Sequence, residues 1–202
     1  MKKKNQIQII AEIGVLTSIA LVLDLLANLW GPLLGFVNGG SVSIAMLPIF
    51  VIAFRRGILP GLEAGLILGV LQIALGKFYY LNFFQFMLDY ILAFTLVGFA
   101  GLFRKGSFKP SHLVYGMLLG SFLRLVSAYF AGALYWSAYI LEGIQGVDST
   151  LHSNFASWLL TPESITWVGS FIYNAAYLIP SALLCILFGL ILQKRGILTV
   201  NH

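Results

Sequence analysis

Residues 83–103, FFQFMLDYILAFTLVGFAGLF, contain one ionisable side chain, Asp89, in an otherwise apolar stretch. A helix of about 20 apolar residues crosses a bilayer, so this stretch predicts a transmembrane helix. A shorter apolar stretch, residues 42–54, contains Pro48 and is needed to complete the topology. Four further stretches of suitable length occupy residues 9–28, 58–76, 113–136 and 168–192. We therefore expect an all-α membrane protein, a six-helix bundle forming one integral membrane domain over residues 1–202.

The composition excludes most other classes of protein. Hydrophobic residues make up 59% of the chain and charged residues only 9%, with a mean hydropathy of +0.93. A soluble domain has roughly a quarter of its residues charged. The net charge of +5 lies at helix ends rather than on one face, which argues against a nucleic-acid partner. The single cysteine, Cys185, rules out a disulfide scaffold.

The distribution of basic residues predicts the orientation. With the N-terminus in the cytoplasm, six crossings leave only Lys77 in an outer loop and Arg124 inside a span. The other ten of the twelve lysines and arginines then face the cytoplasm: Lys2, Lys3, Lys4, Arg55, Arg56, Arg104, Lys105, Lys109, Lys194 and Arg195. The positive-inside rule favours this arrangement. We expect a multi-pass protein of a bacterial plasma membrane, with both termini cytoplasmic.

The basic N-terminus followed by an apolar run could also indicate a signal peptide. The run contains Glu12 and Asp24, lacks a small-residue cleavage site and precedes five more spans, so we interpret it as a retained first helix.

Small residues recur at four-residue spacing in three spans. The third has Gly61, Gly65 and Gly69, and the fifth has Gly116 and Gly120. The first has Gly14 and Ser18. Such a stripe allows close helix packing in lipid, either within the bundle or against another membrane subunit.

Two ionisable residues lie deep in the predicted bilayer. Asp89 is about 10 Å from the outer end of the fourth span at the helical rise per residue, and Arg124 is midway along the fifth. They could form a structural salt bridge, or Asp89 could belong to a ligand pocket. Glu12 and Glu63 lie near cytoplasmic ends, where water or basic loops can reach them, and Asp24 near an outer end could snorkel or cap.

Aromatic and polar residues gather in the outer half of the last three spans. They are Tyr79, Tyr80, Gln85 and Tyr90, then Tyr129, Tyr135, Trp136 and Tyr139, then Trp167, Tyr173, Asn174 and Tyr177. An interfacial aromatic belt explains some of them. It does not explain Asp89 or Asn174, which lie one to two turns deeper. A buried carboxylate among aromatic rings suits a planar, cationic ligand.

Recognisable catalytic and cofactor motifs are missing. The three histidines have no metal-ligand spacing, and the sequence has neither a Walker loop nor a nucleophile motif. We therefore predict a protein that is not an enzyme and that binds no metal or cofactor. A stand-alone channel or carrier and a membrane-embedded enzyme remain as alternative classes, although no inverted repeat is detectable.

Several segments resemble the thiamine-specific S components of energy-coupling factor (ECF) vitamin transporters. They are EIG (12–14), GGSVSIAMLP (39–48), FRRG (54–57), LDYILAF (88–94), GLFR (101–104) and YNAAY (173–177). The resemblance implies a six-helix subunit that captures a vitamin from outside and docks onto a transmembrane coupling subunit and two ATPases. It places the docking motif at Gly14 and Ser18, and a gate in residues 29–41.

The same resemblance implies the substrate-binding residues. The pocket carboxylate falls on Asp89, in place of the more usual glutamate, and the polar position of the second helix falls on Ser43. The other implied positions are Tyr79, Tyr90, Arg124, Trp136 and Asn174.

Some positions depart from the family. Ala128 replaces a histidine, Gly169 a tyrosine and Gly39 a tryptophan. Either Tyr129 and Trp167 fill the gaps, or the pocket accepts pyridoxine or a hydroxymethylpyrimidine instead of thiamine.

Overall fold

The computed structural model describes residues 2–31, 40–75, 81–104, 109–136 and 162–198, and every regular element in these ranges is helical. Helices α1 (Lys2–Trp30), α2 (Met46–Arg56) and α3 (Ile58–Ala74) come first, and α6 (Pro110–Tyr135) and α8 (Pro162–Lys194) last. Between them, α4 (Phe83–Phe86), the π-helix η2 (Met87–Leu92), α5 (Ala93–Thr95) and the 3-10 helix η3 (Leu96–Phe103) follow one another without a break. The prediction of an all-α membrane protein with six helices is confirmed, the fourth being this composite helix.

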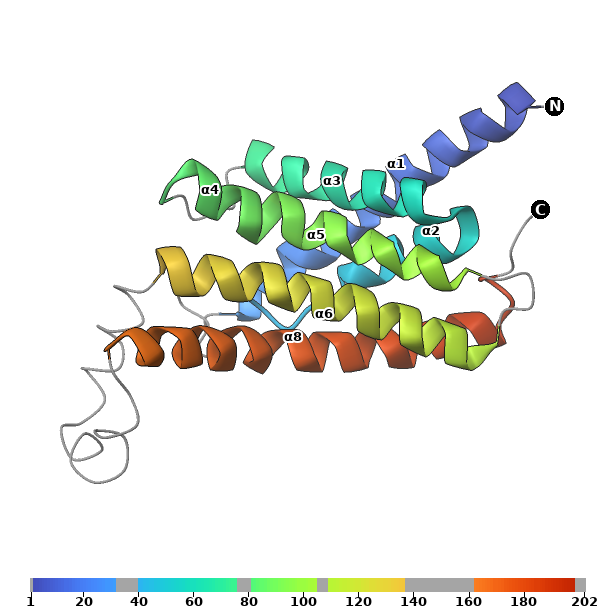
Figure 1. Ribbon diagram of the computed structural model, residues 1–202. Coiled ribbons are helices and arrows are strands. Elements are labelled where there is room, and N and C mark those ends of the chain that lie inside the picture. Colours follow the sequence, from blue (N-terminus) through green and yellow to red (C-terminus); the bar gives the residue numbers. More distant parts are fainter. Residues whose placement is uncertain (1, 32–39, 76–80, 105–108, 137–161, 199–202) are drawn as a thin grey trace.

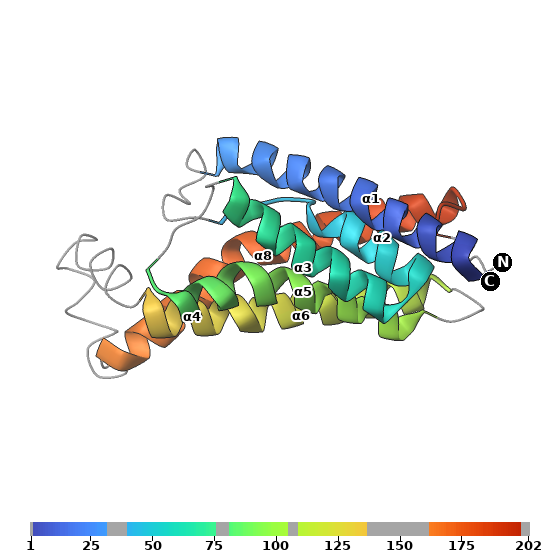
Figure 2. The same ribbon diagram turned by 90° about the horizontal axis from the view of Figure 1, so that it is seen from above.

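The helices form an elongated bundle. Helices α6 and α8 lie side by side along their length, and α1 crosses the opposite side of the bundle next to α2 and α3 (Figures 1 and 2). The first turn of α1 and the last turn of α8 lie at the same end (Figure 2). An even number of crossings produces this arrangement.

Helix α2 is the centre of the core. Met46, Ile49, Phe50, Ile52 and Phe54 are completely buried, although they point to all sides of a helix of only 11 residues. A helix that is apolar all round is stable only when other elements surround it. Here α1, α3, η3 and α8 do so, and protein rather than lipid therefore surrounds this short helix.

The second predicted span begins differently in the structure. We expected it from residue 42, but the helix starts at Met46 and residues 41–44 lack regular structure. Non-helical backbone at membrane depth must be shielded from lipid and hydrogen-bonded. The buried Ser43 meets both needs, since its N–H donates to Ser181 Oγ (2.9 Å) and its Oγ accepts from the Ala45 N–H (3.0 Å).

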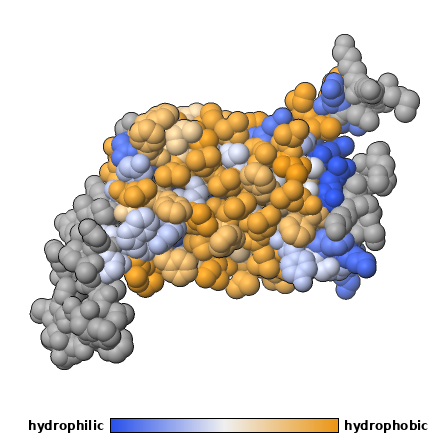
Figure 3. All heavy atoms as spheres, viewed as in Figure 1, coloured by the Kyte–Doolittle hydropathy of each residue, from blue (hydrophilic) through white to orange (hydrophobic). Residues whose placement is uncertain are grey.

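The surface of the bundle is apolar. Figure 3 shows that the face in view is apolar across its middle, with polar residues gathered at the two ends, and the exposed large hydrophobic side chains come from all the long helices. Among the described residues, four helices are long and apolar enough to cross a membrane, Gln6–Trp30, Phe83–Phe103, Pro110–Tyr135 and Thr166–Lys194, and Ile58–Ala74 is a shorter apolar helix. The chain is a multi-pass membrane protein.

The glycine stripes of the third and fifth spans pack inside the bundle. A Cβ added at Gly65 would overlap the backbone of Phe94, and one at Gly120 would meet Phe50 and the backbone of Val97 at 2.8 Å. The intramolecular interpretation is therefore correct for these stripes. Gly14 differs, since a Cβ there would have no neighbouring atom within 4 Å.

Candidate functional site

Asp89 lies on the π-helix η2, where the composite helix is widened. Its Oδ2 accepts hydrogen bonds from Gln85 Nε2 (2.6 Å) and from Trp136 Nε1 at the end of α6 (3.0 Å). Its Oδ1 accepts no hydrogen bond from the residues that the structure describes. The described residues thus hold the half-buried carboxylate through one of its two oxygens. Short π-helical segments frequently mark functional sites.

The local sequence explains how Asp89 is held. Asn82 caps α4, its Oδ1 accepting from the N–H of Gln85 (2.9 Å). The fully buried Gln85 accepts from the N–H of Leu81 at its Oε1 (3.1 Å) and donates to Asp89 one helical turn later. Residues four apart in a helix share a face, which places this amide against the carboxylate. Gln85 thus connects the start of the helix to Asp89.

Asn174 of α8 is a second buried polar centre. Its Nδ2 donates to the carbonyls of Ser170 (2.9 Å) and Ala128 (3.3 Å), and its Oδ1 accepts from the hydroxyl of Tyr177 (2.7 Å). This side chain joins α8 to α6. The two helices approach closely here because Gly132 leaves room for Ser170, whose Oγ donates to the carbonyl of Tyr129 (2.8 Å).

Tyr177 is a neighbour of the predicted residue Asn174. It is buried, its ring lies 6.2 Å from that of Tyr173, and its hydroxyl donates to Oδ1 of Asn174 (2.7 Å). The predicted substrate-binding residues did not include this tyrosine. Its position three residues after Asn174 could have identified it, because residues three apart lie on one helical face.

The Asp89–Arg124 salt bridge considered from the sequence is wrong. No ion pair joins these two described residues. Instead, the guanidinium of Arg124 lies 4.0 Å from the centroid of the Phe94 ring. Asp24 of α1 also points into the bundle, where its Oδ2 accepts from Gln72 Nε2 of α3 (2.7 Å).

Three further predicted residues have other surroundings. The hydroxyl of Ser43 is used within its own turn. The ring of Tyr129 packs on Trp167, Phe130 and Phe171, with centroids 5.5 to 6.2 Å apart, and within the described part of the chain it has no ring contact with the residues around Asp89. Tyr79 lies outside the described residues, as does Gly39.

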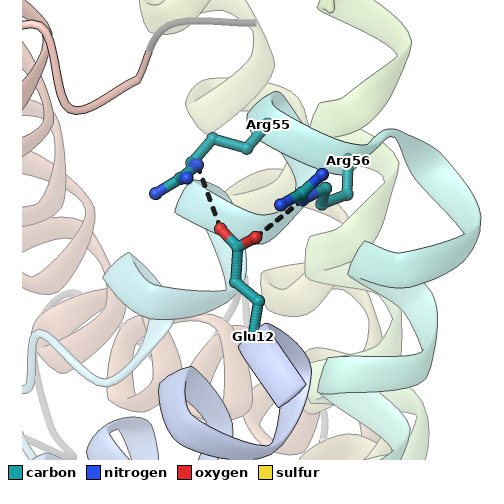
Figure 4. A network of polar contacts seen from close by, with 3 residues as sticks. All are labelled: Glu12, Arg55 and Arg56. Carbon is teal, nitrogen blue, oxygen red and sulfur yellow. Dashed lines mark hydrogen bonds and ion pairs between the residues drawn. The ribbon is translucent and has the colours of Figure 1, made fainter. Parts of the chain in front are cut away.

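Glu12 forms two ion pairs at the end of the bundle opposite to Asp89 and Trp136, and these are the ion pairs within the described residues. Its carboxylate contacts Nε of Arg55 (3.0 Å) and Nε of Arg56 (2.6 Å), as Figure 4 shows. This agrees with the expectation that basic residues neutralise Glu12. The cluster fixes α1 to the end of α2.

The predicted docking pair lies on the outer side of α1. Gly14 and Ser18 are exposed, and Ser18 Oγ donates to the carbonyl of Gly14 (2.8 Å). The inward face carries other residues, Ile13, Thr17, Ala20, Asp24 and Ala27.

Comparisons with known proteins agree on one family. Residues 10–162 match the family model described as Thiamine transporter protein (Thia_YuaJ). The chain is 32% identical over 195 residues to Thiamine transporter ThiT of Bacillus subtilis (strain 168), across 92% of this chain and 90% of that protein. It is also 32% identical over 156 residues to Thiamine transporter ThiT of Lacticaseibacillus paracasei, across 71% of this chain and 75% of that protein.

A solved structure agrees with the sequence relatives. The structure of ThiT from Listeria monocytogenes superposes with a TM-score of 0.74 at 26% sequence identity, covering 98% of this chain and 100% of that one. The resemblance found in the sequence is confirmed, as is the prediction of a transporter rather than an enzyme. By its sequence over most of its length and by its fold, the chain belongs to the thiamine transporter family.

Proposed function

We propose that this protein is the thiamine-binding S component of an ECF importer, and that thiamine binds at the cluster around Asp89. The main support is the arrangement of the Asp89 carboxylate, which Gln85 and Trp136 hold through Oδ2 while Oδ1 has no described donor. A carboxylate fixed beside an indole suits a cationic ring. Trp136, Tyr79 and Tyr90 stack on this ring, and Asn174 bonds its polar edge.

Tryptophan fluorescence of the purified protein in detergent tests this proposal, because Trp136 is part of the site. Thiamine, pyridoxine and hydroxymethylpyrimidine are titrated in parallel. Saturable quenching by thiamine at nanomolar concentration is expected. Loss of this quenching in the Trp136→Phe variant would show that Trp136 is the tryptophan that reports binding. A response only to pyridoxine or to the free pyrimidine would contradict thiamine binding and indicate that Ala128 and Gly169 have changed the specificity.

Asp89→Ala and Asp89→Asn test the role of the carboxylate. Both are expected to abolish tight binding, whereas Glu63→Gln, on the exposed side of α3, leaves it unchanged. Retained helical circular dichroism and elution volume show that each variant is folded. Unchanged thiamine affinity in Asp89→Asn would show that binding does not need the charge of Asp89.

We further propose that the exposed Gly14 and Ser18 dock onto the ECF transmembrane coupling subunit, which acts with two ATPases. Both termini face the cytoplasm in this arrangement, in a bacterial plasma membrane. A cysteine at position 6, in a Cys185→Ala background, is expected to react with a membrane-impermeant maleimide in inverted vesicles but not in intact cells. Labelling in intact cells would show that the N-terminus faces the outside and would contradict the proposed topology.

A further inference from the structure

Helix α6 holds the Asp89 segment through its backbone as well as through its carboxylate. Trp136 Nε1, at the end of α6, donates to Asp89 Oδ2 (3.0 Å). Ser127 Oγ, earlier on the same helix, donates to the carbonyl of Leu88 (2.7 Å), the residue directly before Asp89. The proposed binding role uses Trp136 but leaves the hydrogen bond from Ser127 unexplained.

The hydrogen bond from Ser127 crosses a buried interface between helices that are distant in sequence. Ser127 is only 3% exposed, and α6 packs against η2 there. Helix α3 packs against η2 as well, since a Cβ added at Gly69 would lie 2.8 Å from the carbonyl oxygen of Tyr90. Water cannot easily replace a donor in such a place, so removal of the hydroxyl leaves the Leu88 carbonyl with one partner fewer.

The π-helix makes this hydrogen bond important for geometry. Two hydroxyls donate to its carbonyls, Ser127 Oγ to Leu88 and Thr95 Oγ1 to Ile91 (2.6 Å). Thr95 belongs to the same composite helix, whereas Ser127 comes from a neighbouring one and can fix η2 against it. Relaxation of the widened turn to an α-helix would rotate Asp89 relative to the residues after it by one residue, roughly 100°. Such a rotation would carry the carboxylate away from Trp136.

We propose that Ser127 is a positioning residue of the binding site, which holds the π-helix at Leu88 so that the Asp89 carboxylate stays against Trp136. Ser127 itself does not touch the ligand. Its hydroxyl acts through the backbone, because the carbonyl that it binds belongs to the peptide group shared by Leu88 and Asp89. The inference rests on the proposed function for the identity of the ligand, but not for the link between Ser127 and the Asp89–Trp136 hydrogen bond.

Thiamine titration of Ser127→Ala tests this role, with Ser121→Ala as the matched control. Both serines are buried on α6, but Ser121 Oγ has no hydrogen-bond partner among the described residues. Ser127→Ala is expected to weaken binding about fivefold, the effect of losing a neutral hydrogen bond of typical strength. Ser121→Ala leaves the affinity unchanged. An equal change in the two variants, or no change in either, would overturn the role of Ser127.

A measurement without ligand separates positioning from a general loss of stability. The nuclear magnetic resonance signal of the Trp136 indole N–H, identified by its absence in Trp136→Phe, reports the hydrogen bond to Asp89. This signal is expected to shift in Ser127→Ala and to stay in place in Ser121→Ala. If Ser127→Ala binds thiamine more weakly or unfolds at a lower temperature while the signal stays in place, Ser127 has a structural role only and the proposal is wrong.

A conservative variant keeps the test decisive if Ser127→Ala does not fold. Ser127→Cys retains the size of the side chain and a weak donor, so it is expected to weaken binding less than Ser127→Ala does. It is compared with Ser121→Cys, and equal affinities and unmoved Trp136 signals in these two variants would overturn the proposal. If the wild-type protein binds no thiamine but the Trp136 signal moves only in the Ser127 variants, the proposed function fails and the positioning role holds.

Discussion

At the residue scale, the proposed site depends on side chains that hold Asp89 as much as on Asp89 itself. One carboxylate oxygen accepts from both Gln85 and Trp136. Hydrogen bonds to a charged acceptor are about twice as strong as those between neutral groups. They fix the orientation of the carboxylate before a ligand arrives, and such preorganisation lowers the entropic cost of binding.

Gln85→Met is expected to weaken thiamine binding about tenfold, since a lost hydrogen bond to a charged group costs about 1.5–3 kcal/mol and part of this cost appears in binding. Methionine retains the length of the side chain but removes its donor and acceptor. Fluorescence titration measures the change, with Gln6→Met on the exposed part of α1 as the matched control. Equal affinities for the wild type and Gln85→Met would show that Asp89 needs no support from Gln85.

At the element scale, small residues determine which helices touch. In lipid the hydrophobic effect does not drive helices together, so close packing and hydrogen bonds do. Gly65 lets α3 approach the backbone at Phe94 and Thr95, directly after the π-helix that carries Asp89. Ser127 of α6 supports the same π-helix by donating to the carbonyl of Leu88 (2.7 Å). The unusual helical geometry at the site is therefore supported from two sides.

Gly65→Ala is expected to destabilise the fold by about 1–3 kcal/mol, because the added methyl group overlaps the Phe94 carbonyl and backbone atoms cannot move away cheaply. Gly14→Ala is the matched control, in which the methyl group meets no atom within 4 Å. Thermal unfolding in detergent compares the two variants. Equal unfolding temperatures would mean that α3 shifts to accommodate the methyl group.

At the scale of the whole molecule, α1 carries the proposed docking surface and is anchored to the bundle by polar contacts. Gly14 and Ser18 lie on its outer face and Asp24 on its inner face. Glu12 fixes its N-terminal half to α2 through Arg55 and Arg56, and Asp24 fixes its C-terminal half to Gln72 of α3. The proposed docking surface is therefore part of a helix that is held in place at two polar points.

Gly14→Leu combined with Ser18→Leu is expected to leave thiamine affinity unchanged and to stop uptake in cells that contain the ECF partners. Bulky side chains at these positions obstruct close approach of another helix, and a Cβ at Gly14 meets no atom of the bundle within 4 Å. Radiolabelled thiamine uptake and fluorescence titration measure the two effects. Ala176→Leu, on the exposed side of α8, is the control, and normal uptake by the double variant would refute the docking surface.

The sequence by itself determined the class of protein, the six helices and most of the polar residues of the proposed site. Hydropathy is a local property, so the length and composition of each apolar stretch predict a helix without knowledge of its neighbours. Asp89 and Asn174 could be selected in the same way, because a polar group deep in lipid is costly and is retained mainly where it has a partner or a function. The glycine stripes were also recognisable, but their spacing did not show which would face outward, and only the family resemblance indicated Gly14 and Ser18.

Only the tertiary structure decided which partners these groups have. The rotation of α1 turns Asp24 inward to Gln72 of α3, no ion pair joins the described Asp89 and Arg124, and the burial of α2 allows residues 41–44 to remain non-helical. The π-helix at Asp89 likewise depends on contacts with α3 and α6. Pairing of buried charges depends on the rotation and crossing of helices far apart in the sequence, and no local pattern of residues encodes that geometry.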